Sequence, residues 1–236
     1  MKIGVLVFPG SNCDDDMMHV LASVAGAKVQ KIWHKDFSLA GHGHLDGIVL
    51  PGGFSYGDYL RSGAIARFSH IMEEVVKFAN HGGFVWGICN GFQILCECHL
   101  LPGVLLRNEN QKFICKNVYL STTNNDTAIT NALSENEIIK IPIAHADGRY
   151  FDTKDNIDML WQNDQVLFQY CDENGNIDAM SNPNGSIDNI AGISNLKKNV
   201  FGMMPHPERA AEKALGNVDG KKIFDSMVNE LAHFIA

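Results

Sequence analysis

A cysteine between two glycines, where an apolar run meets a helix-like run, most constrains how this chain can fold. The segment Gly87–Gly91 reads Gly-Ile-Cys-Asn-Gly, with Phe84–Trp86 before it and Phe92–Leu95 after it. This pattern predicts a nucleophile elbow, a sharp strand-to-helix turn that needs small residues nearby. The positive end of the following helix would favour Cys89 as a thiolate. A buried structural cysteine beside a glycine turn is the alternative for the pentapeptide alone.

The composition narrows the class of protein. A chain of 236 residues with 45% hydrophobic residues fits one α/β domain, which we assign to residues 1–236. The net charge of -8 is dispersed, which argues against a nucleic-acid partner. No apolar stretch is long enough to cross a bilayer. We interpret residues 3–8 as a buried strand and not a signal peptide, because a turn and three aspartates follow at once.

The cysteines give no sign of a disulfide framework or a metal centre. There are six, with no Cys-x-x-Cys pair among them: Cys13, Cys89, Cys96, Cys98, Cys115 and Cys171. A domain of this size needs no disulfides, so we expect reduced thiols in a cytoplasmic protein. Cys96 and Cys98 precede His99, but residues two apart on a helix face different directions, which disfavours zinc. We therefore expect no metal in this chain.

The first half alternates strand-like and helix-like segments. Strands are expected at residues 3–8, 29–33 and 47–50, and helices at residues 14–25 and 61–80. This alternation predicts an α/β fold with a doubly wound, mostly parallel sheet. Ligands bind such sheets beyond the carboxyl ends of the strands. Pro51–Gly53 and Cys89 both follow strands, so we expect them to lie near each other in space.

The second half consists of short β-like runs separated by turn residues. A closing helix is expected over residues 219–235, with Asp219 as a possible N-cap. No linker is long enough to divide the chain. The β-like runs are Phe113–Leu120, Ile138–Ala144, Val166–Tyr170 and Asn189–Ser194.

A cysteine nucleophile needs a base and a group that orients the base. His206 lies just past an apolar run that ends at Met204, between two prolines that stiffen the loop. Glu208, two residues on in an extended segment, can return to the same side and accept a hydrogen bond from the ring. An ordinary loop histidine is the alternative for His206 alone. The flanking prolines and the paired carboxylate favour a catalytic role.

Acyl transfer also needs N–H donors for an oxyanion. Gly53 can offer its backbone N–H with no side chain in the way, and the N–H of Asn90 directly follows the nucleophile. A tight turn after a strand would by itself explain Gly52 and Gly53. Their expected proximity to Cys89 favours the oxyanion site.

Together, Pro51–Gly53, the Gly-x-Cys-x-Gly elbow and Pro205–Glu208 resemble a class I glutamine amidotransferase domain. The resemblance covers essentially the whole chain and implies a single domain with a flavodoxin-like fold. Five stretches also resemble one particular member of this family: Pro9–Asp14, Pro51–Arg61, Gly63–Arg67, Cys89–Leu95 and Gly202–Ala210.

The resemblance implies a glutaminase reaction. Cys89 attacks the side-chain amide of glutamine, His206 moves the protons, and Glu208 orients His206. Ammonia leaves, a glutamyl thioester forms, and water releases glutamate. By the same resemblance Gln93 would contact the bound glutamine, and the region around His145 would line the pocket through its backbone.

The resemblance also implies that ammonia passes to a separate ATP-dependent synthetase subunit, which a small accessory subunit joins. The chain has no Gly-x-x-x-x-Gly-Lys-Ser/Thr loop, so we expect no cofactor here and assign ATP and Mg²⁺ to the synthetase. The segment Phe54–Arg67 mixes aromatic residues with arginines, as interfaces often do. It either docks the synthetase or shapes the glutamine pocket.

Two other functions compete with this one. A free-standing hydrolase with an elbow cysteine, such as a γ-glutamyl hydrolase or a peptidase, would act without a synthetase. A redox sensor or chaperone of similar fold would not need the pair His206 and Glu208, and its Cys89 would respond to peroxide and not to glutamine analogues.

Overall fold

The computed structural model describes residues 1–233, and most of its eleven strands belong to one large sheet. The strands are β1 (Lys2–Val7), β2 (Lys28–Trp33), β3 (Gly47–Leu50), β4 (Phe84–Ile88), β5 (Val104–Leu106), β6 (Ile114–Thr122), β7 (Ile138–His145), β8 (Arg149–Phe151), β9 (Val166–Cys171), β10 (Ile190–Ser194) and β11 (Val200–Met203). The α-helices are α1 (Asp14–His19), α2 (His70–Asn80), α3 (Asn90–Glu97), α4 (Lys154–Gln162) and α5 (Lys221–His233).

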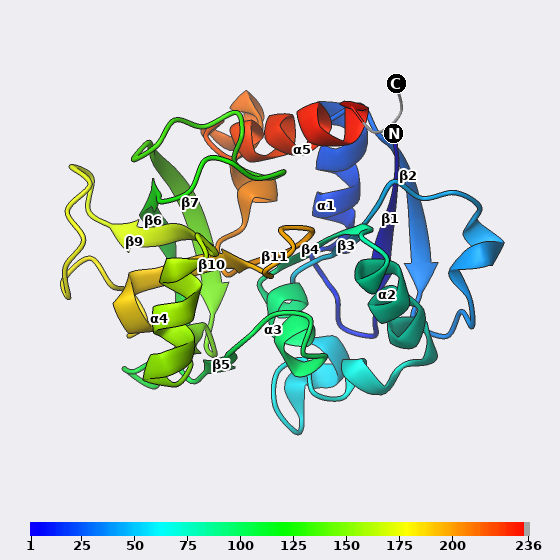
Figure 1. Cartoon of the computed structure of the whole chain (residues 1–236), viewed down its shortest axis with the longest axis horizontal. Helices are drawn as coiled ribbons and strands as arrows, with labels where there is room; N and C mark the ends of the chain where they lie inside the picture. The colour runs from blue at the N-terminus through cyan, green and yellow to red at the C-terminus, as the bar shows by residue number, and fades with distance from the viewer. Residues whose placement is uncertain (234–236) are drawn as a thin grey trace.

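The large sheet has nine strands in the order β2-β1-β3-β4-β11-β10-β9-β6-β7 (Figure 1). Its first five strands are parallel and follow the flavodoxin-like order of a doubly wound sheet. Every residue of β4 is buried, which suits a central strand covered by helices on both faces. The predicted α/β class and doubly wound sheet are confirmed. The predicted single domain over residues 1–236 stays a prediction.

The short β-like runs of the second half extend the same sheet with antiparallel strands. β10 pairs with both β11 and β9, and β6 then joins β9 to β7. A separate two-stranded sheet joins β5 to β8. The carboxyl end of β7 lies near the carboxyl ends of β4 and β11. There Pro142 O accepts a hydrogen bond from His206 N–H at 2.8 Å.

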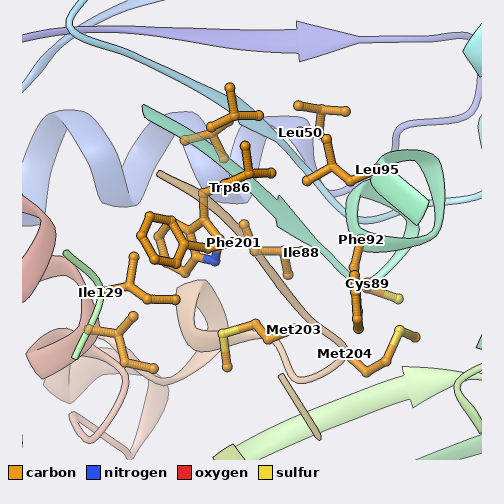
Figure 2. Packing of buried hydrophobic residues seen from close by; sticks show 14 of the residues in the cluster. Leu50, Trp86, Ile88, Cys89, Phe92, Leu95, Ile129, Phe201, Met203 and Met204 are labelled. Atoms are coloured by element: carbon orange, nitrogen blue, oxygen red, sulfur yellow. The ribbon is translucent and has the colours of Figure 1, made fainter. Parts of the chain in front are cut away.

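Helices cover the parallel part of the sheet on both faces. α1 and α5 lie on one side, and α2 and α3 on the other (Figure 1). The indole ring of Trp86 on β4 lies 5.3 Å from the ring of Phe224 on α5, measured between centroids. On the opposite face Leu95 of α3 packs near Leu50 at the end of β3 (Figure 2). β4 is therefore fixed from both sides immediately before Cys89.

Three predicted helices differ from the structure. The helix expected over residues 14–25 is α-helical only to His19 and continues as a π-helix from Val20 to Val24. The helix expected over residues 61–80 begins only at His70. Ser69, with an extended ψ of 137°, separates it from a short 3-10 helix at Ala66–Phe68. Gly63 excludes a helix before that, because it has a φ of +79° and a Cβ there would lie 2.8 Å from Ile94 N.

The last helix starts at Lys221, and Asp219 does not cap it. The carboxylate of Asp219 instead accepts a hydrogen bond from Lys140 N–H at 2.8 Å, tying the start of the helix to β7. The predicted end at residue 235 lies outside the described residues. α4 was not predicted, although Thr153 caps it by accepting a hydrogen bond from Asn156 N–H. None of the described helices has the length and apolar character needed to cross a membrane.

Candidate active site

Cys89 lies at a sharp turn between β4 and α3. Its φ of 52° and ψ of -106° are unusual for a residue with a side chain. Its N–H donates to Met203 O at 2.8 Å, and its carbonyl accepts from Gln93 N–H at 3.1 Å. The turn has no room for a side chain at Gly91, where a Cβ would lie 2.0 Å from Leu50 O. This is the geometry of a nucleophile elbow.

His206 reaches Cys89 because β11 lies beside β4. Met203 pairs with Ile88 in the parallel register, so the residues that follow the two strands leave the sheet at the same edge. The Nδ1 atom of His206 lies 2.6 Å from Oε1 of Glu208, and both side chains are almost fully buried. Oε1 of Glu208 accepts a hydrogen bond from Nδ1–H in this arrangement, which leaves Nε2 for proton exchange with a neighbour.

The charges around His206 favour its protonated form. Burial lowers the pKa of the imidazole, but the negative charges of Glu208 and Cys89 outweigh this and raise the pKa to about 10. Within the described part of the chain, Nε2 makes no hydrogen bond to the protein. The structure thus brings the three predicted residues together as a thiol, an imidazole and a carboxylate.

The turn after β3 lies against the same histidine. A Cβ on Gly52 would lie 2.6 Å from Cε1 of His206. Gly53 has a φ of +143°, and a Cβ there would lie 2.5 Å from Gly10 O. The expected proximity of this turn to the cysteine loop follows from the adjacent strands β3 and β4. Both glycines are needed for close packing, whatever their part in binding an oxyanion.

Gln93 and Asn90 connect the elbow helix to the loop that follows β7. Nδ2 of Asn90 donates to Oε1 of Gln93 at 2.9 Å, and Nε2 of Gln93 donates to Asp147 O at 2.6 Å. Oδ1 of Asn90 also accepts from Ser55 N–H at 3.1 Å. The amide of Gln93 is therefore bonded at both ends, and it ties together the segments that surround Cys89.

His145 is the last residue of β7, and Asn108 holds it. Oδ1 of Asn108 lies 3.0 Å from Nδ1 of His145 and also accepts from Gly148 N–H at 3.0 Å. Nδ1 of His145 must therefore carry the proton. Burial, followed by the nearby charge of His206, lowers the pKa of His145 to about 4, so its ring is neutral.

Three residues near the site were not singled out from the sequence. Cys13 lies next to the carboxylate of Glu208, Asp58 lies next to Asn90, and Asn108 organises the loop after β7. Cys13 and Asp58 fall within the stretches of family resemblance, which could have drawn attention to them. Nothing in the local sequence marks Asn108, because its partners come from β7 and the loop beyond it.

The described structure holds the site closed. Cys89 is 4% exposed and His206 is 1% exposed, so both reactive side chains lie almost entirely beneath the surface. A cavity of about 840 Å³ lies elsewhere, beside residues such as Gly83, Phe84 and Lys198 at the opposite edge of the parallel sheet. We place the chemistry at Cys89, because the reactive groups converge there and not at this cavity.

Comparison with known proteins identifies the class of protein. Residues 1–230 match the CobB/CobQ-like glutamine amidotransferase domain. The chain belongs to this family of glutamine amidotransferases. A glutamine amidotransferase from Thermotoga maritima has the same fold, with a TM-score of 0.57, 13% identity, and coverage of 100% of this chain and 85% of that one.

Relatives that share about half of their residues with this chain have the same protein name. The chain is 51% identical over 231 residues to "Phosphoribosylformylglycinamidine synthase subunit PurQ" from Salinibacter ruber, covering 98% of this chain and 97% of the relative. The protein of the same name from Pseudothermotoga lettingae is 55% identical over 228 residues, covering 96% and 94%. A chain in the structure of PurLQS from Thermotoga maritima is 46% identical, with a TM-score of 0.85 and 98% coverage of both chains.

Proposed function

We infer that this chain is the glutaminase subunit of phosphoribosylformylglycinamidine synthase and works in de novo purine biosynthesis. The relatives that share about half of its residues over nearly its full length carry that name. The observation that carries the chemistry is the elbow cysteine beside a buried histidine, whose Nδ1 lies 2.6 Å from a buried carboxylate. We expect the chain to work in the cytoplasm.

In the first half of the reaction the sulfur of Cys89 attacks the side-chain amide carbon of glutamine. Nε2 of His206 takes the thiol proton and delivers it to the amide nitrogen, which leaves as ammonia. Glu208 stabilises the imidazolium and keeps Nε2 directed at the reacting atoms. The raised pKa of His206 suits the delivery step, because the ring holds its proton until the leaving nitrogen can accept it.

The second half of the reaction hydrolyses the glutamyl thioester. His206, now neutral, takes a proton from water, and the resulting hydroxide attacks the thioester carbonyl. Glutamate leaves, and the proton returns to the sulfur of Cys89. The N–H groups of Gly53 and Asn90 are the proposed donors to the oxyanion in both halves.

The glutamine pocket is proposed to lie between α3 and the loop after β7. Gln93 and the region of His145 form its walls. The hydrogen bonds from Asn90 to Gln93 and from Gln93 to Asp147 O support this role, because they would hold the walls at a set separation. Asn108 would act behind them by orienting His145.

The ammonia is proposed to pass to a synthetase subunit, which converts formylglycinamide ribonucleotide to formylglycinamidine ribonucleotide with ATP and Mg²⁺. No cofactor is proposed for this chain. A small accessory subunit would complete the complex. In the segment Phe54–Arg67, Tyr59 is 90% exposed and Leu60 is 67% exposed, while Ser55 is buried and bonded to Asn90. This arrangement supports both proposed roles of the segment, docking the synthetase and shaping the pocket.

Substitution of the nucleophile tests the division of labour. Cys89→Ser should lower glutamine-dependent synthesis by at least about 10³-fold, because a serine hydroxyl is a poor nucleophile in a site built for a thiol. The assembled complex should still use added ammonia at the wild-type rate. Loss of both activities in a folded complex would contradict the proposal that the ATP chemistry belongs to the partner.

Labelling distinguishes the competing functions. A glutamine-mimicking diazoketone should add once to the wild-type chain and not to Cys89→Ala, as measured by intact mass. Labelling should be stronger when the synthetase is present. Labelling that ignores the synthetase would favour a free-standing hydrolase, and no labelling of the folded protein under either condition would favour a redox sensor or chaperone.

A further inference from the structure

We propose that Cys13, His206 and Glu208 form a reversible inhibitory site for a soft divalent cation such as Zn²⁺. The binding itself is argued from this chain's geometry alone. The inhibition rests on the proposed glutaminase function, because two of the three ligands belong to the proposed catalytic group. Such an ion would act as an inhibitor and has no part in the glutaminase reaction.

The three side chains offer a sulfur, a nitrogen and an oxygen in one small volume. One ligand atom from each lies within 4.8 Å of the other two, and all three residues are buried. Bonds of about 2.3 Å to sulfur and about 2.0–2.2 Å to nitrogen and oxygen would place such atoms roughly 3.3–3.6 Å apart around a tetrahedral zinc ion. The ligand atoms would have to approach one another by at most about 1.5 Å, which side-chain rotation of Cys13 and Glu208 can supply.

The glycine at position 52 lets the sulfur and the imidazole lie close together. A Cβ on Gly52 would lie 2.6 Å from Cε1 and 3.3 Å from Nδ1 of His206 and 3.2 Å from Sγ of Cys13, so any side chain there would push the two ligands apart. Oε2 of Glu208 is buried and has no hydrogen-bond partner within the described residues. An unpaired carboxylate oxygen is costly in a buried site, and a cation would compensate it.

The donor set selects the kind of ion. A thiolate, an imidazole and a carboxylate together suit Zn²⁺ and Cd²⁺ better than Mg²⁺ or Ca²⁺, which prefer oxygen ligands. The two negative ligands would balance the charge of a divalent ion. Nη2 of Arg209 lies 3.2 Å from Sγ of Cys13 and would have to move away when the ion binds. The guanidinium would keep a partner, because its Nε donates to Asp16 at 3.2 Å.

Binding would stop catalysis through the histidine tautomer. The ion would replace the proton that Nδ1 of His206 shares with Glu208, and it would displace the thiol proton of Cys13, so two protons pass to solvent. Counted from the imidazolium, the proton on Nε2 is the one that remains. With the ion in place of the Nδ1 proton, the ring could neither release the Nε2 proton to the leaving nitrogen nor take a proton from water, although Cys89 itself would be untouched.

The first experiment measures metal binding by the full-length chain alone. Cd²⁺ is the probe, because its bond to a thiolate gives an ultraviolet charge-transfer band. We expect a band of one thiolate per bound ion in wild type and in Cys89→Ala, and its loss in Cys13→Ala. The matched control is Cys171→Ala, another buried cysteine, which should keep the band. A band that survives in Cys13→Ala and disappears in Cys89→Ala would overturn the proposal.

The second experiment measures inhibition. The Zn²⁺ concentration that halves the glutaminase rate should rise at least about 10-fold in Cys13→Ala, compared with that variant's own metal-free rate. Cys13→Ser keeps the size of the side chain and serves if the alanine variant does not fold. Equal sensitivity of the folded variants and wild type would overturn the proposal. If Cd²⁺ binds through Cys13 but the chain has no glutaminase activity, the site stands and the proposed function fails.

Discussion

The backbone at Cys89 is strained, and its neighbours maintain the strain. Positive φ at a residue with a side chain costs on the order of 1–3 kcal/mol and persists only where surrounding contacts over-determine it. Here the N–H of Cys89 is bonded to β11 and its carbonyl to the first turn of α3. The same two contacts direct the thiol away from the sheet, toward the histidine that follows β11.

Removing the charge of the carboxylate should weaken catalysis without removing the nucleophile. Glu208→Gln should lower kcat by roughly 10²–10⁴-fold, because the ring loses the partner that sets its tautomer. The negative charge of Glu208 raises the pKa of His206, so the basic limb of the pH–rate profile should move to lower pH. Steady-state kinetics across pH provide the check.

The control for this substitution is a second Glu–His pair on the surface. Oε1 of Glu212 lies 2.9 Å from Nε2 of His19, and both side chains are partly exposed. Glu212→Gln should leave both kcat and the pH profile unchanged. An equal loss of kcat in the two variants, or an unshifted basic limb in Glu208→Gln, would contradict the role assigned to Glu208.

Asp58 should make the fold more stable in acid than at neutral pH. Burial, together with the nearby charge of Asp147, raises its pKa to about 6, although hydrogen bonds from its neighbours oppose this. The folded state therefore holds the proton more tightly than the unfolded chain. This contribution to stability is fully present below the ordinary pKa near 4 and is lost as the pH rises through about 6.

Asp58→Asn should consequently raise the melting temperature at pH 7.5 and have little effect at about pH 3.5, below the ordinary pKa of the carboxyl. We expect a gain of about 2 °C or more at the higher pH. Thermal unfolding of both proteins at the two pH values measures it. A variant that is less stable at pH 7.5 would show that the ionised carboxylate has a stabilising partner.

At the scale of elements, close packing of α3 against the ends of β3 and β4 decides where the site lies. The glycines of the elbow let α3 lie close to these strand ends. The sequence pattern at Gly87–Gly91 correctly predicted the sharp strand-to-helix turn. The failed prediction over residues 61–69 has a related cause. Gly63 lies against the backbone of α3 with a positive φ, and the short 3-10 helix Ala66–Phe68 ends at the extended Ser69, so only the apolar residues from Ile71 onward belong to α2.

Gly91→Ala should disrupt this packing. The added methyl group would lie 2.0 Å from Leu50 O, a backbone atom that cannot rotate away. We expect a loss of at least about 3 kcal/mol in the free energy of unfolding, or failure to fold. Gly41→Ala is the control, because Gly41 is exposed and has nothing within 4 Å of a Cβ. Similar denaturation midpoints for the two variants would show that α3 can shift without cost.

At the scale of the whole molecule, the sheet joins the two halves of the chain. β11 comes from the end of the chain and lies between β4 and β10. It supplies the neighbour that β4 would otherwise lack, and it leads directly to His206. Folding of the first half and assembly of the site therefore depend on the same long-range strand pairing.

The chain should consequently unfold as one cooperative unit. Calorimetry should give a single transition, with circular dichroism and tryptophan fluorescence changing together. A fragment ending near residue 103 should not fold, because β4 would become an exposed edge. Two separate transitions, or a folded fragment, would contradict the single domain predicted over residues 1–236.

The sequence by itself determined the local features of this protein. The glycines around Cys89, the prolines around His206 and the alternation of apolar runs act over a few residues, so they can be recognised without a structure. The tertiary structure alone decided what those features meet. It placed β11 beside β4 and packed Gly63 against α3. It also placed Cys13 beside the carboxylate of Glu208 and Asn108 beside His145. Contacts between residues far apart in sequence depend on strand order and register, which no local pattern specifies.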